Sequence, residues 1–272
     1  MSEFTKAFKE MTWSFSRVHC VENCNYEFYL NYLLFDKDGN RIYDNEQNFY
    51  AAFGKFCHDL LEAILKRKLS IDEAYIKYQE EYDKRMDKFN IREATNEKYF
   101  YLGLDYFGDL DFNWLDKYEV LGIEKKVHFK VGKYSFVGYI DLLLKDKETG
   151  EIIVIDHKSS EFPLGKKGKV LKRKQEAYLS YKRQLYLYSK AIIEEYVVPP
   201  SKIKWNYFRE KQWLELPFIQ EEYEEALDWA EKTIEKIINE EEFPARVDYF
   251  YCHNLCGFRN SCEYKSMGGE VA

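Results

Sequence analysis

The chain has 272 residues, of which 46% are hydrophobic, and a formal net charge of −7. This length suffices for one elaborated α/β domain, and this hydrophobic content excludes a disordered chain. The negative charge argues against wholesale coating of nucleic acid, but it leaves room for a local basic groove. No apolar run approaches ~20 residues and no charged-then-apolar leader opens the sequence, so we expect a cytoplasmic protein without a membrane segment.

The first part of the sequence has the hydrophobic periodicity of helices. Helices are predicted over 24–35, 48–68 and 70–86, and the last begins behind a Ser cap with acidic residues in its first turn. A further helical region is predicted over 91 to about 118, with interruptions near Gly103 and Gly108.

The pattern then changes to that of strands. Residues 124–158 are β-rich, and a long amphipathic helix over 174–196 is stopped by Pro199 and Pro200. Two strands, "KIKWNYF" and "QWLELPFI", and a helix over 221–241 follow. Without repeats or low-complexity linkers, we expect one domain over 1–272. Its predicted parts are a helical N-terminal part of about 20–118, an α/β core of about 119–220, and a C-terminal helix with a Cys-rich tail over 221–272.

The segment "VGYIDLLLKDKETGEIIVIDHKSS" (137–160) predicts two buried strands joined by a tight turn, yet it carries Asp141, Asp156 and Lys158. A symmetric turn places Asp141 opposite Asp156, with Cβ atoms about 4.5–5.5 Å apart. Lys158 points to the same face as Asp156 because side chains alternate along a strand. Two buried carboxylates repel each other, and a divalent cation such as Mg²⁺ or Mn²⁺ would remove that cost. Alternatively, Lys158 alone neutralises a structural ion pair, or the turn is asymmetric and the aspartates never meet.

Two helices contribute further polar residues. His58 follows Gly54 by four residues beside an apolar helix face, where a histidine is more often part of the core than a ligand. Gln184 and Tyr188 are four residues apart and therefore share one helix face.

Four short motifs occur in a consistent order: "GKFCH" (54–58), "GYID" (138–141), "IDHK" (155–158) and "QLYLY" (184–188). This ordered set resembles the RecB-like branch of the PD-(D/E)xK nuclease superfamily. The resemblance implies a restriction-endonuclease-like α/β fold with a mixed central sheet flanked by helices. It also implies phosphodiester hydrolysis that depends on Mg²⁺ or Mn²⁺.

The resemblance also implies roles for individual residues. The metal ligands would be His58, Asp141, Asp156 and the backbone carbonyl of His157. Lys158 would position or activate water, and a lysine in such a place can have a depressed pKa. Gln184 and Tyr188 would complete the catalytic set, while Glu124 matches a weaker acidic position of the family.

Cysteines cluster near both ends of the sequence. "SFSRVHCVENCNYEFYLNY" (14–32) and "CHNLCGFRNSC" (252–262) resemble the iron–sulfur members of this branch, which include AddB-type nuclease domains and CRISPR adaptation nucleases. The resemblance implies a [4Fe–4S] cluster on Cys24, Cys252, Cys256 and Cys262 that joins the N- and C-terminal segments. The spacing departs from the usual pattern by one residue between Cys252 and Cys256, so His253 is an alternative ligand and Zn²⁺ an alternative metal.

A basic run, "KKGKVLKRK" (166–174), follows the catalytic hairpin. We expect it to bind the DNA backbone, with Arg17 contributing phosphate contacts. The predicted DNA-binding residues are Arg17, Lys166, Lys167, Lys169, Lys172, Arg173 and Lys174. Tyr and Phe side chains near the cleft could stack on the bases of a single strand.

These observations favour a metal-dependent DNA exonuclease that acts on ends or single strands in recombination, repair, replication or phage DNA processing. The alternatives are a CRISPR adaptation nuclease that trims DNA before integration and a non-catalytic DNA-end-binding protein. No GxxxxGK[ST] motif is present, so any translocation requires a partner such as a helicase. A recombinase or an integrase is the other kind of partner that we expect.

Overall fold

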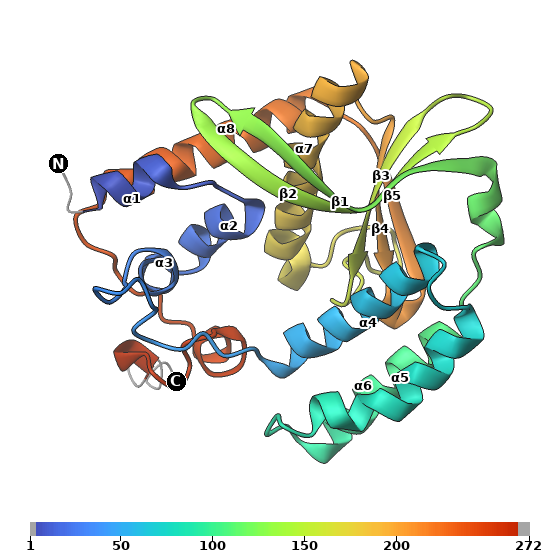
Figure 1. The fold of residues 1–272 in the computed structure, drawn as a ribbon, viewed down its shortest axis with the longest axis horizontal. Helices are drawn as coiled ribbons and strands as arrows, with labels where there is room; N and C mark the ends of the chain where they lie inside the picture. The colour runs from blue at the N-terminus through green and yellow to red at the C-terminus, as the bar shows by residue number, and fades with distance from the viewer. Residues whose placement is uncertain (1–3, 266–272) are drawn as a thin grey trace. The chain divides into compact units, whose positions relative to one another are not determined.

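A computed structural model describes residues 4–265 of the chain (Figure 1). Within these residues the chain divides into two compact units. The terminal unit comprises residues 4–48, 128–137 and 227–265, and the central unit comprises Phe49–Val127 and Gly138–Ala226. The single domain inferred from the sequence stays a prediction. None of the described helices has the length and apolar character that a bilayer crossing requires.

The strands form one mixed five-stranded sheet in the order β1-β2-β3-β4-β5. They are β1 (Tyr118–Val131), β2 (Tyr134–Asp146), β3 (Ile152–Lys158), β4 (Lys202–Tyr207) and β5 (Gln212–Pro217). β3 pairs with β2 and β4 with β5 in antiparallel fashion, whereas β3 and β4 are parallel. The predicted mixed α/β architecture is therefore confirmed.

Eight α-helices and several single turns accompany the sheet in the described chain. The helices are α1 (Thr5–Glu10), α2 (Phe15–Asn23), α3 (Asn25–Tyr32), α4 (Phe49–Leu65), α5 (Ile71–Met86), α6 (Glu93–Gly108), α7 (Gln175–Tyr196) and α8 (Gln220–Ile238). The 3₁₀ turns are η1 (Asn113–Lys117), η2 (Lys172–Lys174) and η3 (Phe208–Glu210), and a π-helical turn, η4, spans Tyr251–Leu255.

Local sequence signals explain where several helices begin. Ser70 and Glu73 form the capping box at the start of α5, as the Ser cap predicted. Ser14 accepts a hydrogen bond from the backbone amide of Arg17, so the Ser-x-Ser-Arg segment caps a helix, α2, that the sequence did not predict. The predicted interruption at Gly103 is wrong, because α6 continues to Gly108. Gly103 is instead a packing position, since a Cβ there would lie 2.2 Å from the Tyr78 hydroxyl oxygen.

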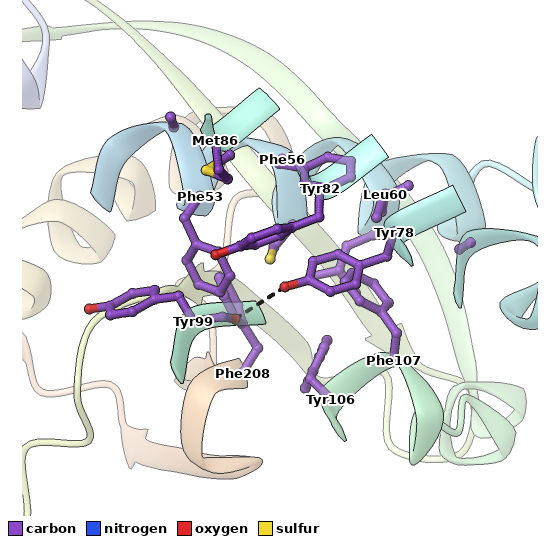
Figure 2. Close-up of a cluster of buried hydrophobic side chains, with 14 of the residues drawn as sticks. Phe53, Phe56, Leu60, Tyr78, Tyr82, Met86, Tyr99, Tyr106, Phe107 and Phe208 are labelled. Carbon is purple, nitrogen blue, oxygen red and sulfur yellow. Dashed lines mark hydrogen bonds between the residues drawn. The ribbon is translucent and has the colours of Figure 1, made fainter. Parts of the chain in front are cut away.

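The core of the central unit is rich in aromatic side chains, as Figure 2 shows. α4, α5 and α6 supply most of them, and Phe208 from η3 joins them. The Tyr78 hydroxyl is buried here and donates to the backbone carbonyls of Tyr99 and Phe100. These hydrogen bonds satisfy a polar group that would otherwise be costly to bury, so the high tyrosine content is compatible with a tightly packed core.

Successive residues of β3 face helices on opposite sides of the sheet. The His157 ring lies 5.8 Å from the ring of His58 on α4, whereas the Lys158 ammonium contacts Gln184 on α7. Ile153 and Ile155 pack with Leu65 at the end of α4, on the same side as His157. α4 and α7 therefore flank β3, and each can supply side chains to the end of this strand.

Candidate active site

The β2–β3 hairpin has the predicted register. Leu142 pairs with Ile155, and continuing this register by one position sets Asp141 opposite Asp156. At that position the side chain of Asp141 takes the place of a backbone carbonyl in the strand pairing, because its Oδ2 accepts a 2.7 Å hydrogen bond from the His157 amide. The carboxylate of Asp141 is thereby fixed at the point where the two strands separate.

His58 reaches this carboxylate from α4. Its Nδ1 lies 3.6 Å from Asp141 Oδ2. Gly54, one helical turn earlier, permits the approach, because a Cβ at this position would lie 2.7 Å from the Ser159 hydroxyl oxygen just beyond β3. The spacing of Gly and His in "GKFCH" thus has a geometric reason: the glycine brings the helix against the strand end, and the histidine projects from the same face.

Glu124 on β1 completes a group of three possible metal ligands. One ligand atom each from His58, Glu124 and Asp141 lies within 4.8 Å of the others. Glu124 has a φ of +49°, in the left-handed region that non-glycine residues rarely occupy. Backbone strain of this kind persists where the surrounding structure enforces it, often at functional sites. Burial, with the Asp141 charge, raises the pKa of Glu124 to about 7.

Asp156 and Lys158 form a buried ion pair beside this group. The Lys158 ammonium lies 2.6 Å from Asp156 Oδ2, and only 4% of Asp156 is exposed. Lys158 also donates a 2.8 Å hydrogen bond to Gln184 Oε1, and the amide of Gln184 donates to the Tyr188 hydroxyl at 3.3 Å. Gln184 and Tyr188 therefore hold the lysine in place from α7. A Cβ at Gly138 would lie 2.5 Å from the Tyr188 ring, which explains the glycine of "GYID".

One contact of Lys158 was not foreseen from the sequence. Its ammonium lies 4.3 Å from the centre of the Tyr181 ring. Tyr181 precedes Gln184 by three residues, so both project from the same face of α7. The three-residue spacing between Tyr181 and Gln184 was the feature of the sequence that could have revealed this contact with Lys158.

The charges of the buried pair follow from their surroundings. Burial raises the pKa of Asp156, with Asp141 adding to the rise and Lys158 opposing it. Burial acts to lower the pKa of Lys158, but Asp156 and Tyr181 outweigh it and raise the pKa above its usual value. The expectation of a depressed lysine pKa is therefore wrong, and the ammonium remains charged near neutrality.

His157 points away from this site, as the strand alternation predicts. Its Nδ1 lies 3.1 Å from the side-chain amide nitrogen of Asn206, which also donates to the Tyr106 hydroxyl. Burial lowers the pKa of His157 to about 3, so its ring is neutral. The role of its backbone carbonyl as a metal ligand stays a prediction.

The arrangement suits a hard divalent cation. Carboxylate oxygens with one imidazole nitrogen are a donor set that Mg²⁺ and Mn²⁺ accept. The raised pKa values of Glu124 and Asp156 show that negative charge is crowded and poorly solvated here. A cation would relieve that cost. His58, Glu124 and Asp141 could hold it, and Asp156 lies beside them against Lys158.

The basic run forms a small hairpin after β3. An isolated bridge joins Leu164 to Val170, with Gly168 in the turn at φ +69°. Arg173 and Lys174 pair with Glu161, whose pKa falls to about 2 through these contacts. The remaining lysines are exposed and have no carboxylate within 4.0 Å among the described residues; they are Lys166, Lys167, Lys169 and Lys172. In this run, Arg173 and Lys174 are thus neutralised by Glu161, whereas the four exposed lysines are available to bind an anionic partner.

Arg17 lies in the terminal unit. Its guanidinium sits 4.9 Å from the centre of the Tyr32 ring and donates to the backbone carbonyl of Thr12. Together with Tyr32 and Arg41 it lines an open pocket of about 430 Å³. Its role in DNA binding stays a prediction.

The four cysteines proposed as cluster ligands line one pocket of the terminal unit. Cys24 lies at the start of α3, Cys252 in η4, and Cys256 and Cys262 in the following turns. Backbone amides approach the sulfurs: Arg246 donates to Cys24 and Phe258 to Cys256, each at 3.4 Å. Burial, with Glu27 nearby, raises the pKa of Cys256 to about 12.

The unusual cysteine spacing has a structural explanation. η4 is a π-helical turn, in which the Cys256 amide donates to the Tyr251 carbonyl five residues earlier. A π turn accommodates one residue more than an α turn, so it absorbs the extra residue between Cys252 and Cys256. The alternative ligand His253 contacts the Tyr249 carbonyl at 2.8 Å and stacks on the Tyr249 ring. Cys252, not His253, lines the pocket.

The sulfur positions also bear on which metal group fits. Tetrahedral Zn²⁺ with bonds of about 2.3 Å requires sulfurs about 3.8 Å apart. In the part of the chain that the structure describes, no three of these sulfurs lie within 4.8 Å of one another. The four thiols line one pocket, and backbone amides are directed at two of the sulfurs. Iron–sulfur clusters and structural Zn²⁺ both use four-thiolate sets, so the cluster stays a prediction.

Comparisons with known proteins agree with this geometry. Residues 12–263 match the family model described as the PD-(D/E)XK nuclease superfamily. One solved structure, described as a "Putative exonuclease" from Eubacterium rectale, has a TM-score of 0.52 and 14% sequence identity, covering 99% of this chain and 93% of its own. A second, the protein SSO0001, has a TM-score of 0.33 and 18% identity, with 91% and 96% covered. No curated protein sequence matches. The chain belongs to the PD-(D/E)XK nuclease superfamily.

Proposed function

We propose that this protein is a divalent-metal-dependent DNA exonuclease that acts on DNA ends or single strands. The observation that carries the proposal is the convergence of His58, Glu124 and Asp141 within 4.8 Å, beside the Asp156–Lys158 pair. Membership of the superfamily supports DNA as the substrate and divalent metal use. Exonuclease action is supported by the fold shared with the Eubacterium rectale protein and by the resemblance to the RecB-like branch.

The side chains have distinct proposed roles. His58, Glu124 and Asp141 would hold the cation, and Asp156 would complete its surroundings. When bound, the cation would polarise the phosphate and lower the pKa of a water molecule. Lys158 is fixed by Asp156 and Gln184, so its ammonium would stabilise negative charge on the phosphate without reorganising. Tyr188 would maintain Gln184 in the orientation that accepts from the lysine.

Cleavage of end-labelled linear DNA and of circular DNA tests this function. With Mg²⁺ or Mn²⁺ we expect the wild-type protein to shorten linear single or double strands from their ends and to leave circles intact. Asp141→Ala and Lys158→Ala should each abolish this activity, while Lys145→Ala, an exposed lysine on β2, should preserve it. DNA binding without cleavage by the wild-type protein would instead indicate a non-catalytic end-binding protein.

We also propose that Cys24, Cys252, Cys256 and Cys262 bind a [4Fe–4S] cluster with a structural role. The pocket that they share and the amide donors at sulfur support this assignment. Anaerobically purified protein should be brown and contain about four iron and four sulfide ions per chain. Cys256→Ser should lose most of the iron, whereas Cys57→Ala, in the apolar core of the central unit, should retain it. A colourless protein that contains zinc would contradict the cluster.

A further inference from the structure

An exposed aromatic ring lies next to the candidate active site without a role in it. Tyr139 is 51% exposed, although it belongs to a strand whose neighbouring residues Gly138 and Ile140 are buried. A large apolar ring at such a position loses part of the hydrophobic stabilisation that burial would provide. Single exposed rings are common on protein surfaces, so what distinguishes Tyr139 is its position beside the site.

Burial along β2 places Tyr139 on the same side of the strand as Asp141. From Tyr134 to Asp141 the residues alternate between buried and accessible, and Tyr139 and Asp141 are both on the accessible side. Residues two apart on a strand are separated by about 7 Å. A ring at that separation from a metal-binding carboxylate is near the nucleotide whose phosphate would lie at the metal.

The backbone of Tyr139 is tied to the catalytic lysine. The Tyr188 hydroxyl interacts with the Tyr139 backbone and accepts a hydrogen bond from Gln184, which in turn contacts Lys158. The position of Tyr139 is therefore held by the side chains that hold Lys158. Only its ring extends into solvent.

We propose that the Tyr139 ring is a stacking platform for a nucleobase adjacent to the scissile phosphate. The occupant is an unpaired base, because a base inside a duplex has no accessible face for an aromatic side chain to cover. This inference rests on the proposed nuclease function and specifies its substrate: a single strand, or a frayed end, is engaged at the cleavage point. Stacking does not read base identity, so no sequence specificity is expected.

Binding in the presence of EDTA, which prevents cleavage, tests the inference. The probes are a short fluorescent single strand with normal bases and one of equal length whose residues are all abasic. We expect Tyr139→Ala to weaken binding of the normal strand by about 5- to 150-fold and to leave binding of the abasic strand unchanged. Tyr139→Phe should bind both strands as the wild type does.

Tyr101 supplies the matched control, since it is 52% exposed in the same unit but lies on α6. Tyr101→Ala should bind both strands normally. Equal effects of Tyr139→Ala on the two strands, or none on either, would overturn the stacking role even in a protein that cleaves DNA. Base-dependent binding that requires Tyr139, in a protein that never cleaves DNA, would keep the stacking role and refute the nuclease proposal.

Discussion

The carboxylate of Asp141 accepts a hydrogen bond from the backbone amide of His157 at 2.7 Å. One side chain thus serves two purposes: it extends the β2–β3 pairing beyond the last ladder pair, and it presents an oxygen to His58. These purposes can be separated by mutation. Asp141→Asn retains an oxygen that can accept from the amide, but it loses the negative charge that the proposed cation site requires.

We therefore expect the two substitutions at Asp141 to differ in stability but not in activity. Asp141→Asn and Asp141→Ala should both reduce kcat by at least about 100-fold. Only Asp141→Ala should lower the free energy of unfolding, by about 1–3 kcal/mol, because the His157 amide loses its partner. Urea unfolding and single-turnover cleavage check this. Equal stability of the two variants would refute the structural part.

Glu124 should strengthen metal binding, and its ionisation should lower the stability of the metal-free protein. Its pKa is about 7 in the folded protein against a usual value of 4.5, so the unfolded chain ionises first. The contribution of Glu124 to metal-free stability should therefore fall as the pH rises from about 4.5 to about 7, and Glu124→Gln should remove this part of the pH dependence.

The same variant should bind Mn²⁺ roughly tenfold or more weakly, as measured by calorimetry at pH 8. Glu119→Gln, an exposed position on the same strand, is the matched control. Unchanged Mn²⁺ affinity of Glu124→Gln would remove Glu124 from the ligand set.

Tyr181 should support Lys158 through its ring face and not through its hydroxyl. Tyr181→Phe should keep kcat within about twofold of wild type, and Tyr181→Leu should lower it by about 2- to 30-fold, the value of a partly buried cation–π contact. KM should change little. Tyr178→Leu is the control on the same helix, since that ring contacts Lys182 instead. Identical losses for Phe and Leu would assign the effect to the hydroxyl.

The exposed and the paired parts of the basic hairpin should differ in their contribution to DNA binding. Replacing Lys166, Lys167 and Lys169 with Ala should reduce the slope of log affinity against log salt for single strands by about 2. Arg173→Ala should have a smaller effect, because Glu161 already neutralises this charge. A triple Ala variant of Lys84, Lys88 and Lys98, all exposed on or near α5 and α6, should leave the slope unchanged.

The sequence predicted those parts of the site that depend on the regular spacing of side chains along a strand or a helix. Strand alternation with a symmetric turn placed Asp141 opposite Asp156, and helical spacing placed Gln184 with Tyr188. The position of Glu124 beside His58 and Asp141 could not be predicted with the same firmness, because it depends on a left-handed backbone conformation that no periodic pattern reveals. Cys252 lines the pocket with the other three cysteines and His253 does not, and this difference depends on a π turn whose extra residue cannot be located from spacing alone.

Buried His157 should make stability depend on pH below neutrality. Its pKa is about 3 in the folded protein against 6.5 for an ordinary histidine, so between these values the unfolded chain binds more protons. The contribution of the neutral His157 ring to stability is therefore fully present above about pH 6.5 and is lost as the pH falls toward 3. His157→Gln should flatten this dependence, although it weakens packing at pH 7, while His128→Gln, exposed on β1, should not. Urea unfolding of the wild type and both variants at pH 7 and pH 5 separates this contribution from the opposite one of Glu124. A difference in stability between the two pH values that His157→Gln leaves unchanged would contradict the neutral buried ring.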